Sequence, residues 1–269
     1  MDYVSPGILY TDEAFYDDAV TQEALYRPEP GSRRSKVWVR QPLRPDWYDD
    51  PAPSASGCTP NPISRTRGNL YVELVEQADQ HQRFSCHAGD YDWETQTVRR
   101  LTLHRDGQLV GEAEGSRTNF SVPQQAGDYR LRYHLDASAL QPVSTRVDTA
   151  WTFRSAGPTG TNPVPVPLLS VDYALPLDVA NKPTDGTASC TVRQAHGVTV
   201  QKITSFELWT SVDDGASWQS VTTSPSSADT FAAQLPKPAA GQAVSLRVKA
   251  TADGGSGIEQ TIIRAYLAG

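Results

Sequence analysis

The sequence lacks any long apolar stretch. Among its 269 residues no run reaches the roughly 18 apolar residues that a membrane-spanning helix requires, so we expect no membrane partner. The opening residues, MDYVSPGILYTDEAFYDD, are polar and acidic where a signal peptide carries its apolar core. The chain is therefore expected to be either cytosolic or a piece of a longer exported precursor.

Several catalytic and ligand-binding motifs are also missing. There is no Gly-x-Ser-x-Gly nucleophile elbow, no Cys-x-x-Cys or His-x-x-x-His spacing, and no Gly-rich phosphate loop that leads into a helix. The adjacent carboxylates Asp17-Asp18, Asp49-Asp50 and Asp213-Asp214 point to opposite faces of an extended chain, which does not build a glycosidase pair. We therefore predict no catalytic residue, no metal site and no cofactor.

An excess of basic residues is absent as well. The 24 Lys and Arg residues against 31 Asp and Glu residues give a formal net charge of -7. Nucleic acids require a basic face, and anionic membranes attract basic segments, so we expect neither partner. The mild acidity favours solubility. His104 and His134 occupy alternating polar positions of strand-like segments, and we expect both to face solvent.

Cysteine is scarce, with three residues in the chain. An odd number in so small a set allows at most one intrachain disulfide. Cys58 and Cys86 both lie near predicted loops of the first half and are the candidates to pair. Cys190 is in phase with Ala188 and Val192 in TASCTVRQ, which predicts a buried strand thiol.

Proline and glycine, by contrast, are plentiful, with 20 and 19 residues. Together with many short apolar–polar alternations they favour an all-β fold. The stretch SAGPTGTNPVPVP, at 155–167, is typical of an extended connector. We therefore predict two β-sandwich domains, 1–156 and 164–269, joined by a linker at 157–163.

The second predicted domain divides into seven strand candidates: LLSVDYAL, TASCTVRQA, ITSFELWTSVD, SWQSVTTS, DTFAAQLP, AVSLRVKATA and IEQTIIRAYLA. That number suits an immunoglobulin-like or fibronectin type III-like sandwich. In the first domain the last two-thirds reads as strands, with Asp106-Gly107 as a two-residue hairpin turn. Its N-terminal lead-in is less regular, and TDEAFYDDAVTQEALY predicts a short helix with Thr11 as its N-cap.

The stretch SVDDGASW fits the pattern Ser-x-Asp-x-Gly-x-x-Trp, the Asp box repeated around sialidase-type propellers. A propeller needs one copy per blade, and this chain has one copy and is too short for that fold. We therefore expect a structural turn that begins at Ser211. Asp213 would accept backbone N–H bonds, Gly215 would supply a positive φ, and Trp218 would pack over the hairpin. A calcium site at Asp213 and Asp214 is the weaker alternative, because the spaced oxygens of a dedicated site are missing.

Three aromatic residues beside carboxylates are the candidate binding residues. Trp47 and Tyr48 lie in DWYDD, and Trp93 lies in YDWETQ, both in loop-like settings. Exposed aromatic rings of this kind stack on sugars or cover a peptide. The competing interpretation is that they plug the end of a sandwich or an interface with a neighbouring domain.

Residues 95–269 contain motifs that resemble the C-terminal region of large secreted subtilisin-like serine peptidases of actinobacteria. The motifs are LTLHRDGQLVGE, GDYRLRYHLD, STRVDTAWTFRSA, SFELWTSVDDGASWQSV and EQTIIRAY, in this order. Such peptidases carry their Asp, His and Ser triad in an N-terminal catalytic domain. None of those motifs occurs here, so the resemblance transfers no catalytic residue to this chain.

The resemblance implies a secreted, all-β, non-catalytic accessory region that supports stability, secretion or the placement of a substrate or partner. The implied partner is the catalytic peptidase domain or a protein substrate. An exported protein meets oxidising surroundings, which favours the pairing of Cys58 with Cys86. The alternative function is a free-standing module that binds carbohydrate or cell wall, and a glycosidase is the third hypothesis.

Overall fold

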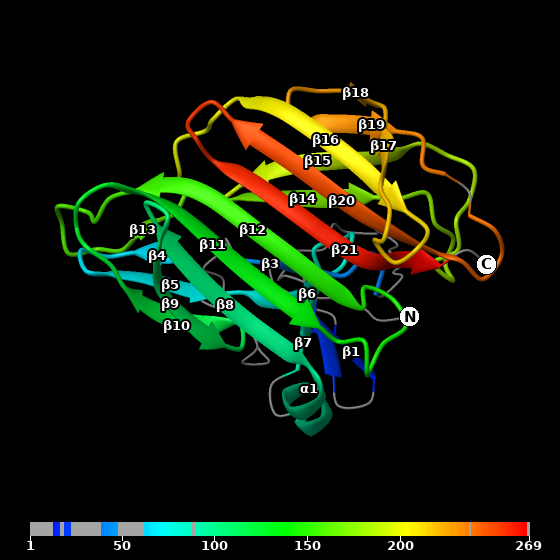
Figure 1. Ribbon diagram of the computed structural model, residues 1–269, viewed down its shortest axis with the longest axis horizontal. Helices are drawn as coiled ribbons and strands as arrows, with labels where there is room; N and C mark the ends of the chain where they lie inside the picture. The colour runs from blue at the N-terminus through cyan, green and yellow to red at the C-terminus, as the bar shows by residue number, and fades with distance from the viewer. Residues whose placement is uncertain are drawn as a thin grey trace, which may run out of the picture.

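A computed structural model of the chain describes residues 13–16, 19–22, 39–47, 62–87, 90–236 and 238–267 (Figure 1). For 13–16, 19–22 and Cys86 it describes the backbone alone. The described chain is almost entirely β, which confirms the predicted fold class. Cys58, Tyr48 and Thr11 lie outside the described residues, so the predicted disulfide, the binding role of Tyr48 and the contacts of Thr11 are not tested.

An antiparallel sheet of eight strands forms the front of the molecule in Figure 1. Its strands, in spatial order, are β17 (Gln219–Val221), β16 (Ile203–Ser211), β20 (Ala243–Ala252), β21 (Gly257–Leu267), β12 (Arg146–Ser155), β11 (Gly127–Asp136), β8 (Val98–Arg105) and β9 (Gln108–Glu114). At its centre β12 pairs with β21, and Trp151 lies opposite Ile258. The sheet therefore includes strands from before and after the predicted linker at 157–163.

Two four-stranded sheets lie behind the large sheet, one behind each half (Figure 1). The first contains β10 (Arg117–Ser121), β5 (Asn69–Glu73), β4 (Ser64–Arg65) and β13 (Val164–Pro165). The second contains β14 (Leu169–Ala174), β15 (Ala188–Gln194), β19 (Thr230–Ala233) and β18 (Thr223–Pro225). Because β13 pairs with β4, the first residues of the predicted second domain complete a sheet of the first.

Within the described ranges, one cluster of buried apolar side chains fills the space between the layers. It includes Leu70 and Leu131 from the first half, Val171 and Val192 from the second, and Trp151 between them. The strands that build it alternate buried and exposed residues, as half-buried strands do. The division into two domains, and the immunoglobulin or fibronectin type of the second, stay predictions.

Each of the seven strand candidates of the second half corresponds to a strand, and SWQSVTTS overlaps two short ones, β17 and β18. The predicted hairpin turn is confirmed too. Asp106 and Gly107 have φ values of 49° and 79°, and Arg105 pairs with Gln108 across them. Both central residues of such a turn need a positive φ, which Asp and Gly tolerate.

The helix predicted within residues 11–26 is wrong. The segment forms a hairpin of β1 (Glu13–Tyr16) and β2 (Ala19–Gln22), with Phe15 opposite Val20. These strands belong to a third sheet that continues through β7 (Phe84–Cys86), β6 (Val75–Ala78) and β3 (Arg44–Asp46). The pairing of β2 with β7 is a contact distant in sequence, and such contacts override a weak local helix preference.

The described residues contain one helix, α1 (Tyr91–Gln96). Asp90 caps it, because its carboxylate Oδ1 accepts a hydrogen bond from the backbone N–H of Trp93 at 3.0 Å. In the part of the chain that the structure describes, no helix has the length and apolar character needed to cross a bilayer.

Candidate binding face

The outer face of the large sheet is the face turned away from the core, and in Figure 1 it is turned towards the viewer. Strand β11 shows how the sequence produces it. Tyr129, Leu131 and Tyr133 are buried, whereas Arg130 and Arg132 between them point outward and meet solvent. Since successive side chains of a strand point to opposite faces, the motif GDYRLRYHLD places its basic residues together on this face.

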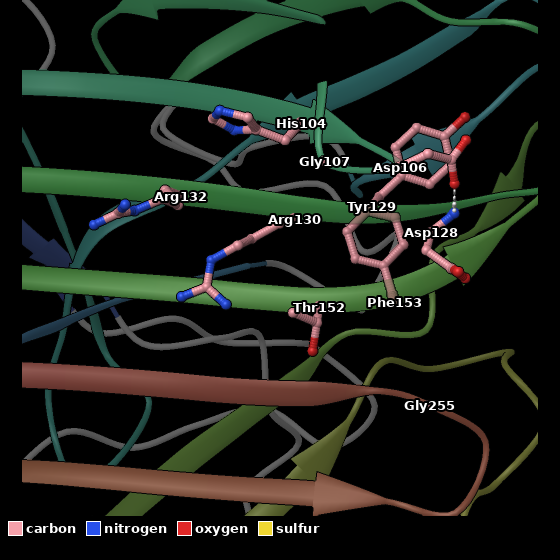
Figure 2. A pocket seen from close by; sticks show the side chains of 10 residues that line it. All are labelled: His104, Asp106, Gly107, Asp128, Tyr129, Arg130, Arg132, Thr152, Phe153 and Gly255. Carbon is pink, nitrogen blue, oxygen red and sulfur yellow. Dashed lines mark hydrogen bonds between the residues drawn. The ribbon is translucent and has the colours of Figure 1, made fainter. Parts of the chain in front are cut away.

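The outer face is hollowed across its strands. A hollow of about 980 Å³ extends from Val98 and Arg100 on β8 to Trp209 on β16. A second hollow, of about 590 Å³, is lined by His104, Arg130 and Arg132 as well, so the two are continuous. Figure 2 shows these three side chains projecting from the adjacent strands β8 and β11.

Five basic or titratable side chains form a patch at one end of the large hollow, which we call the basic grid: Arg100, His104, Arg130, Arg132 and His134. Their positions follow from the register of β8 with β11. His134 lies opposite Arg100, Arg132 opposite Thr102, and Arg130 opposite His104. Opposite residues of an antiparallel pair have Cβ atoms about 4.5–5.5 Å apart, so neighbouring charges of the grid lie close together.

Carboxylates border the basic grid on both sides without lying inside it. Glu112 and Glu114 belong to β9, where they lie opposite Thr102 and Arg100. On the other side lie Asp148 of β12 and Glu259 of β21. The large hollow is therefore lined by more cationic than anionic groups, although the whole chain carries a net charge of -7.

Two members of the grid are paired with these bordering carboxylates. Arg130 Nη2 donates to Glu259 Oε2 at 2.9 Å, and this contact holds the pKa of Glu259 below its usual range. His134 Nδ1 lies 2.8 Å from Asp148 Oδ1, and the hydrogen bond to that carboxylate raises the pKa of His134. The arginine and histidine side chains of this face thus already bind carboxylates within the chain.

The other members of the grid are unpaired. Arg100 and Arg132 are exposed and form no ion pair with any other residue that the structure describes. The Nδ1 atom of His104 is buried and has no hydrogen-bond partner among the described residues. Each arginine presents five N–H donors, so this part of the grid offers free donors to a ligand.

Aromatic residues lie at the opposite end of the large hollow. Trp209 is half-buried on β16 and lies opposite Arg247 of β20. The Arg247 guanidinium lies over the ring of Trp218, 4.0 Å from its centroid, and its Nε donates to Thr261 Oγ1 at 3.3 Å. A cation over an aromatic face is an attractive contact that also fixes the orientation of the arginine.

The turn at Ser211–Trp218 has the contacts that its sequence predicts. The Asp213 carboxylate accepts from the backbone N–H of Ser217 at 2.9 Å and from the Ser211 hydroxyl at 2.6 Å. These bonds lower the pKa of Asp213 to about 2. Gly215 has a φ of 87°, and Trp218 packs against it. These contacts stabilise the turn that joins β16 to β17, which is a structural role.

Gly215→Ala is expected to lower the free energy of unfolding by about 1–2 kcal/mol, because a side chain disfavours a positive φ. The added Cβ would also lie 3.0 Å from Ile263 Cδ1. Urea denaturation measures the change. The control is Gly160→Ala, where no atom lies within 4 Å of the added Cβ and φ is not positive. Equal effects in the two variants would contradict the structural role of Gly215.

The exposure expected for Trp47 and Trp93 is wrong, since each is only 3% exposed. Trp47 packs edge-on against Trp151 with ring centroids 6.5 Å apart. Trp93 lies in α1 rather than in a loop, stacks on His87 at 3.8 Å, and donates its indole N–H to Glu76. Their acidic neighbours in sequence suggested a solvated loop, but neither ring presents a face on which a sugar could stack.

The cysteine predictions have separate outcomes. Cys190 is buried on β15, as expected, and burial raises the pKa of its thiol to about 12. Cys58 lies outside the described residues and only the backbone of Cys86 is described, so the proposed Cys58–Cys86 pair stays a prediction. No group of three His, Cys, Asp or Glu side chains suited to a metal ion occurs among the residues that the structure describes.

The sequence interpretation missed the basic grid, although part of its signal was visible. His104 and His134 were expected at solvent-facing strand positions, and both lie on the outer face. Arg130 and Arg132 continue the same alternation along β11.

No protein-family model matches the chain, and a search of the curated proteins found no match either.

Proposed function

We propose that this chain is a non-catalytic accessory region of a secreted subtilisin-like serine peptidase, and that it holds a partner or substrate beside the catalytic domain. The observation that carries the proposal is the outer face of the large sheet. It is a hollow of about 980 Å³, lined mostly by charged and polar residues, that no other described element covers. A broad hollow on a rigid sheet suits a role in binding, because a sheet holds its side chains in fixed positions.

Two further points support this function. The motifs LTLHRDGQLVGE and GDYRLRYHLD, which carry the resemblance to such peptidases, form β8, β9 and β11, and these strands provide much of the hollow. The rest of the face comes from β12, β21, β20 and β16, which the same resemblance covers. The region that resembles the peptidases is thus the region that builds the face.

The first test of the proposal is to sequence the gene that encodes this chain. We expect its reading frame to include a peptidase domain upstream. Deleting the present region from that enzyme should leave kcat/KM for a short soluble peptide within about twofold, and should lower cleavage of a polymer-bound protein by about tenfold.

The matched control is the same enzyme with Arg117→Gln, a substitution on β10 that leaves the outer face intact. Its rates on both substrates should equal those of the parent. A frame without a peptidase domain would refute the proposal. An equal loss of activity on both substrates would refute it too, because it would indicate that the region only stabilises the enzyme.

A further inference from the structure

We propose that the basic grid binds an acidic polysaccharide of the uronic acid type, which lies across the strands of the outer face. The inference deepens the proposed function by naming the class of ligand, and it rests on that function for its biological setting. It is carried by charge complementarity, by the unpaired donors of the grid, and by the shape and polarity of the hollow.

The charge argument starts from the contrast between the grid and the chain. The grid gathers Arg100, Arg130 and Arg132 with His104 and His134, and no carboxylate lies among them. The rest of the chain is acidic enough to give a net charge of -7. Cationic groups outnumber carboxylates in the lining of the hollow, and they gather at this end of it, so an anion is drawn here in preference to the surrounding surface.

The chemistry of the donors favours carboxylates. A guanidinium group presents two parallel N–H groups that match the two oxygens of a carboxylate. The chain itself shows this geometry at Arg264, whose Nε and Nη2 donate to the two oxygens of Asp214 at 2.9 and 2.7 Å. On the outer face Arg130 binds Glu259. Arg100 and Arg132 are free to bind carboxylates of a ligand in the same way.

The shape of the hollow favours an extended polymer. It passes from β8 over β11, β12, β21 and β20 to β16, and strands are spaced about 4.8 Å apart, which gives a length of roughly 24 Å. One continuous row of the sheet contains Arg100, His134, Asp148, Thr261, Arg247 and Trp209. A ligand that follows this row meets charged groups first and a tryptophan last.

The polarity of the lining separates a sugar polymer from a protein partner. Protein interfaces are centred on buried aromatic or apolar anchors that fill pockets. Here the middle of the hollow is lined by Ala150, Thr261, Glu259 and Lys249, and the aromatic residue that is not buried, Trp209, lies at one end. The guanidinium and hydroxyl groups among its lining residues suit a polyhydroxylated polyanion better than a folded protein.

The test is binding of polygalacturonate to the full chain, measured by isothermal titration calorimetry. The comparison ligands are neutral dextran and three polyanions: dextran sulfate, poly-glutamate and a thymidine oligonucleotide. Each polyanion is compared with polygalacturonate at the same total concentration of negative charge. We expect polygalacturonate to bind about tenfold more tightly than the other polyanions. Dextran should not bind, and added salt should weaken the complex.

Three variants locate the site. Replacing Arg100 and Arg132 together by glutamine should weaken polygalacturonate binding by about tenfold or more. Thr102→Glu, which inserts a carboxylate opposite Arg132, should weaken it by a similar factor. Arg117→Gln makes the same change as each glutamine substitution, at a 69% exposed position on β10 away from the face, and should stay within about twofold. All four positions are exposed or half-buried, so unchanged thermal unfolding checks that the variants fold.

Three results would overturn the inference: no binding of polygalacturonate, binding unchanged in the grid variants, or binding of another polyanion with equal or greater affinity. The last result would assign the grid to a sulfated polymer, an acidic protein or a nucleic acid, according to the probe that wins. This experiment and the deletion experiment fail independently. Polygalacturonate can bind a chain whose gene encodes no peptidase, and an accessory region can act without binding this polymer.

Discussion

Replacing Asp46 by alanine is expected to lower the free energy of unfolding by about 3–5 kcal/mol. Asp46 is 0% exposed, and its two carboxylate oxygens accept from Arg193 Nη2 at 2.7 and 2.6 Å. Arg44 Nη1 donates to the same carboxylate at 3.0 Å. Removal of the carboxylate would leave the buried Arg44 and the half-buried Arg193 to share Asp172 as their one remaining anion among the described residues, which is a far larger loss than that of a surface ion pair.

The Asp46 network joins distant parts of the chain. Arg44 and Asp46 belong to β3, whereas Arg193 belongs to β15 and Asp172 to β14. Arg44 Nε donates to the Val171 carbonyl at 2.6 Å, and the guanidinium groups of Arg44 and Arg193 both contact Asp172. The substitution should therefore loosen the contact between the N-terminal segment and the second four-stranded sheet.

The stability that Asp46 provides depends on pH. Burial raises the pKa of this carboxyl, but Arg193 and Arg44 outweigh that effect and hold it below its usual range. Because its folded pKa lies below the unfolded value of about 3.9, the contribution is present above pH 4. It is lost as the pH falls through the folded pKa. Stability of the Asp46→Ala variant should accordingly fall less steeply in acid than stability of the parent.

Urea denaturation at pH 7 and at lower pH measures both effects. The matched control is Asp128→Ala, since Asp128 is 72% exposed and pairs with an exposed Arg154 at 2.9 Å. It should lower the free energy of unfolding by no more than about 1 kcal/mol. If Asp46→Ala were as mild as the control, the buried network would not contribute in the way proposed.

Trp151→Ala is expected to lower the free energy of unfolding by about 3–5 kcal/mol, because it leaves a large cavity in a closely packed core. Trp151 is 1% exposed and contacts Trp47 edge-on. Its indole N–H also donates to the Leu169 carbonyl at 2.9 Å. The substitution would leave that buried carbonyl without its indole donor, which adds to the cost of the cavity.

The control for this variant is Tyr91→Ala, which removes an aromatic ring that is 76% exposed. Its free energy of unfolding should stay within about 0.5 kcal/mol of the parent. A Trp151→Ala variant as stable as the control would show that the packing around Leu169 is not that of the structure. Because Trp151 connects strands before and after the predicted linker, we expect one cooperative transition that shifts as a whole. Two transitions, with only one shifted, would support domains that unfold separately.

The sequence predicted the strands well where alternation was strict. AVSLRVKATA and GDYRLRYHLD became β20 and β11, because a period of two is compatible with a half-buried strand and not with a helix. It could not predict their order in the sheet. Nothing in the sequences of β12 and β21 indicates that Trp151 will lie opposite Ile258, since pairing depends on the shape of both completed halves.

The candidate site was harder to predict because it depends on register. Arg130, Arg132 and His134 were readable as one exposed set on a single strand. Their alignment with Arg100 and His104 arises only when β8 pairs with β11, and β9 and β10 lie between those strands in sequence. Trp47 was misjudged for a related reason. The sequence neighbour of Trp47, Asp46, looked solvated. In the structure Asp46 is paired with Arg193, which lies far along the chain.

The pairing of β12 with β21 sets an order of events for the nascent chain. Ribosomes deliver β12 well before β21, so one hydrogen-bonding edge of β12 stays open while the second half is made. Contacts between distant segments form slowly, and an open strand edge is a template for pairing with other chains. Pairing of β21, the last described strand, therefore closes the open edge of the first half. The first half must be kept from aggregating until β21 has paired with β12.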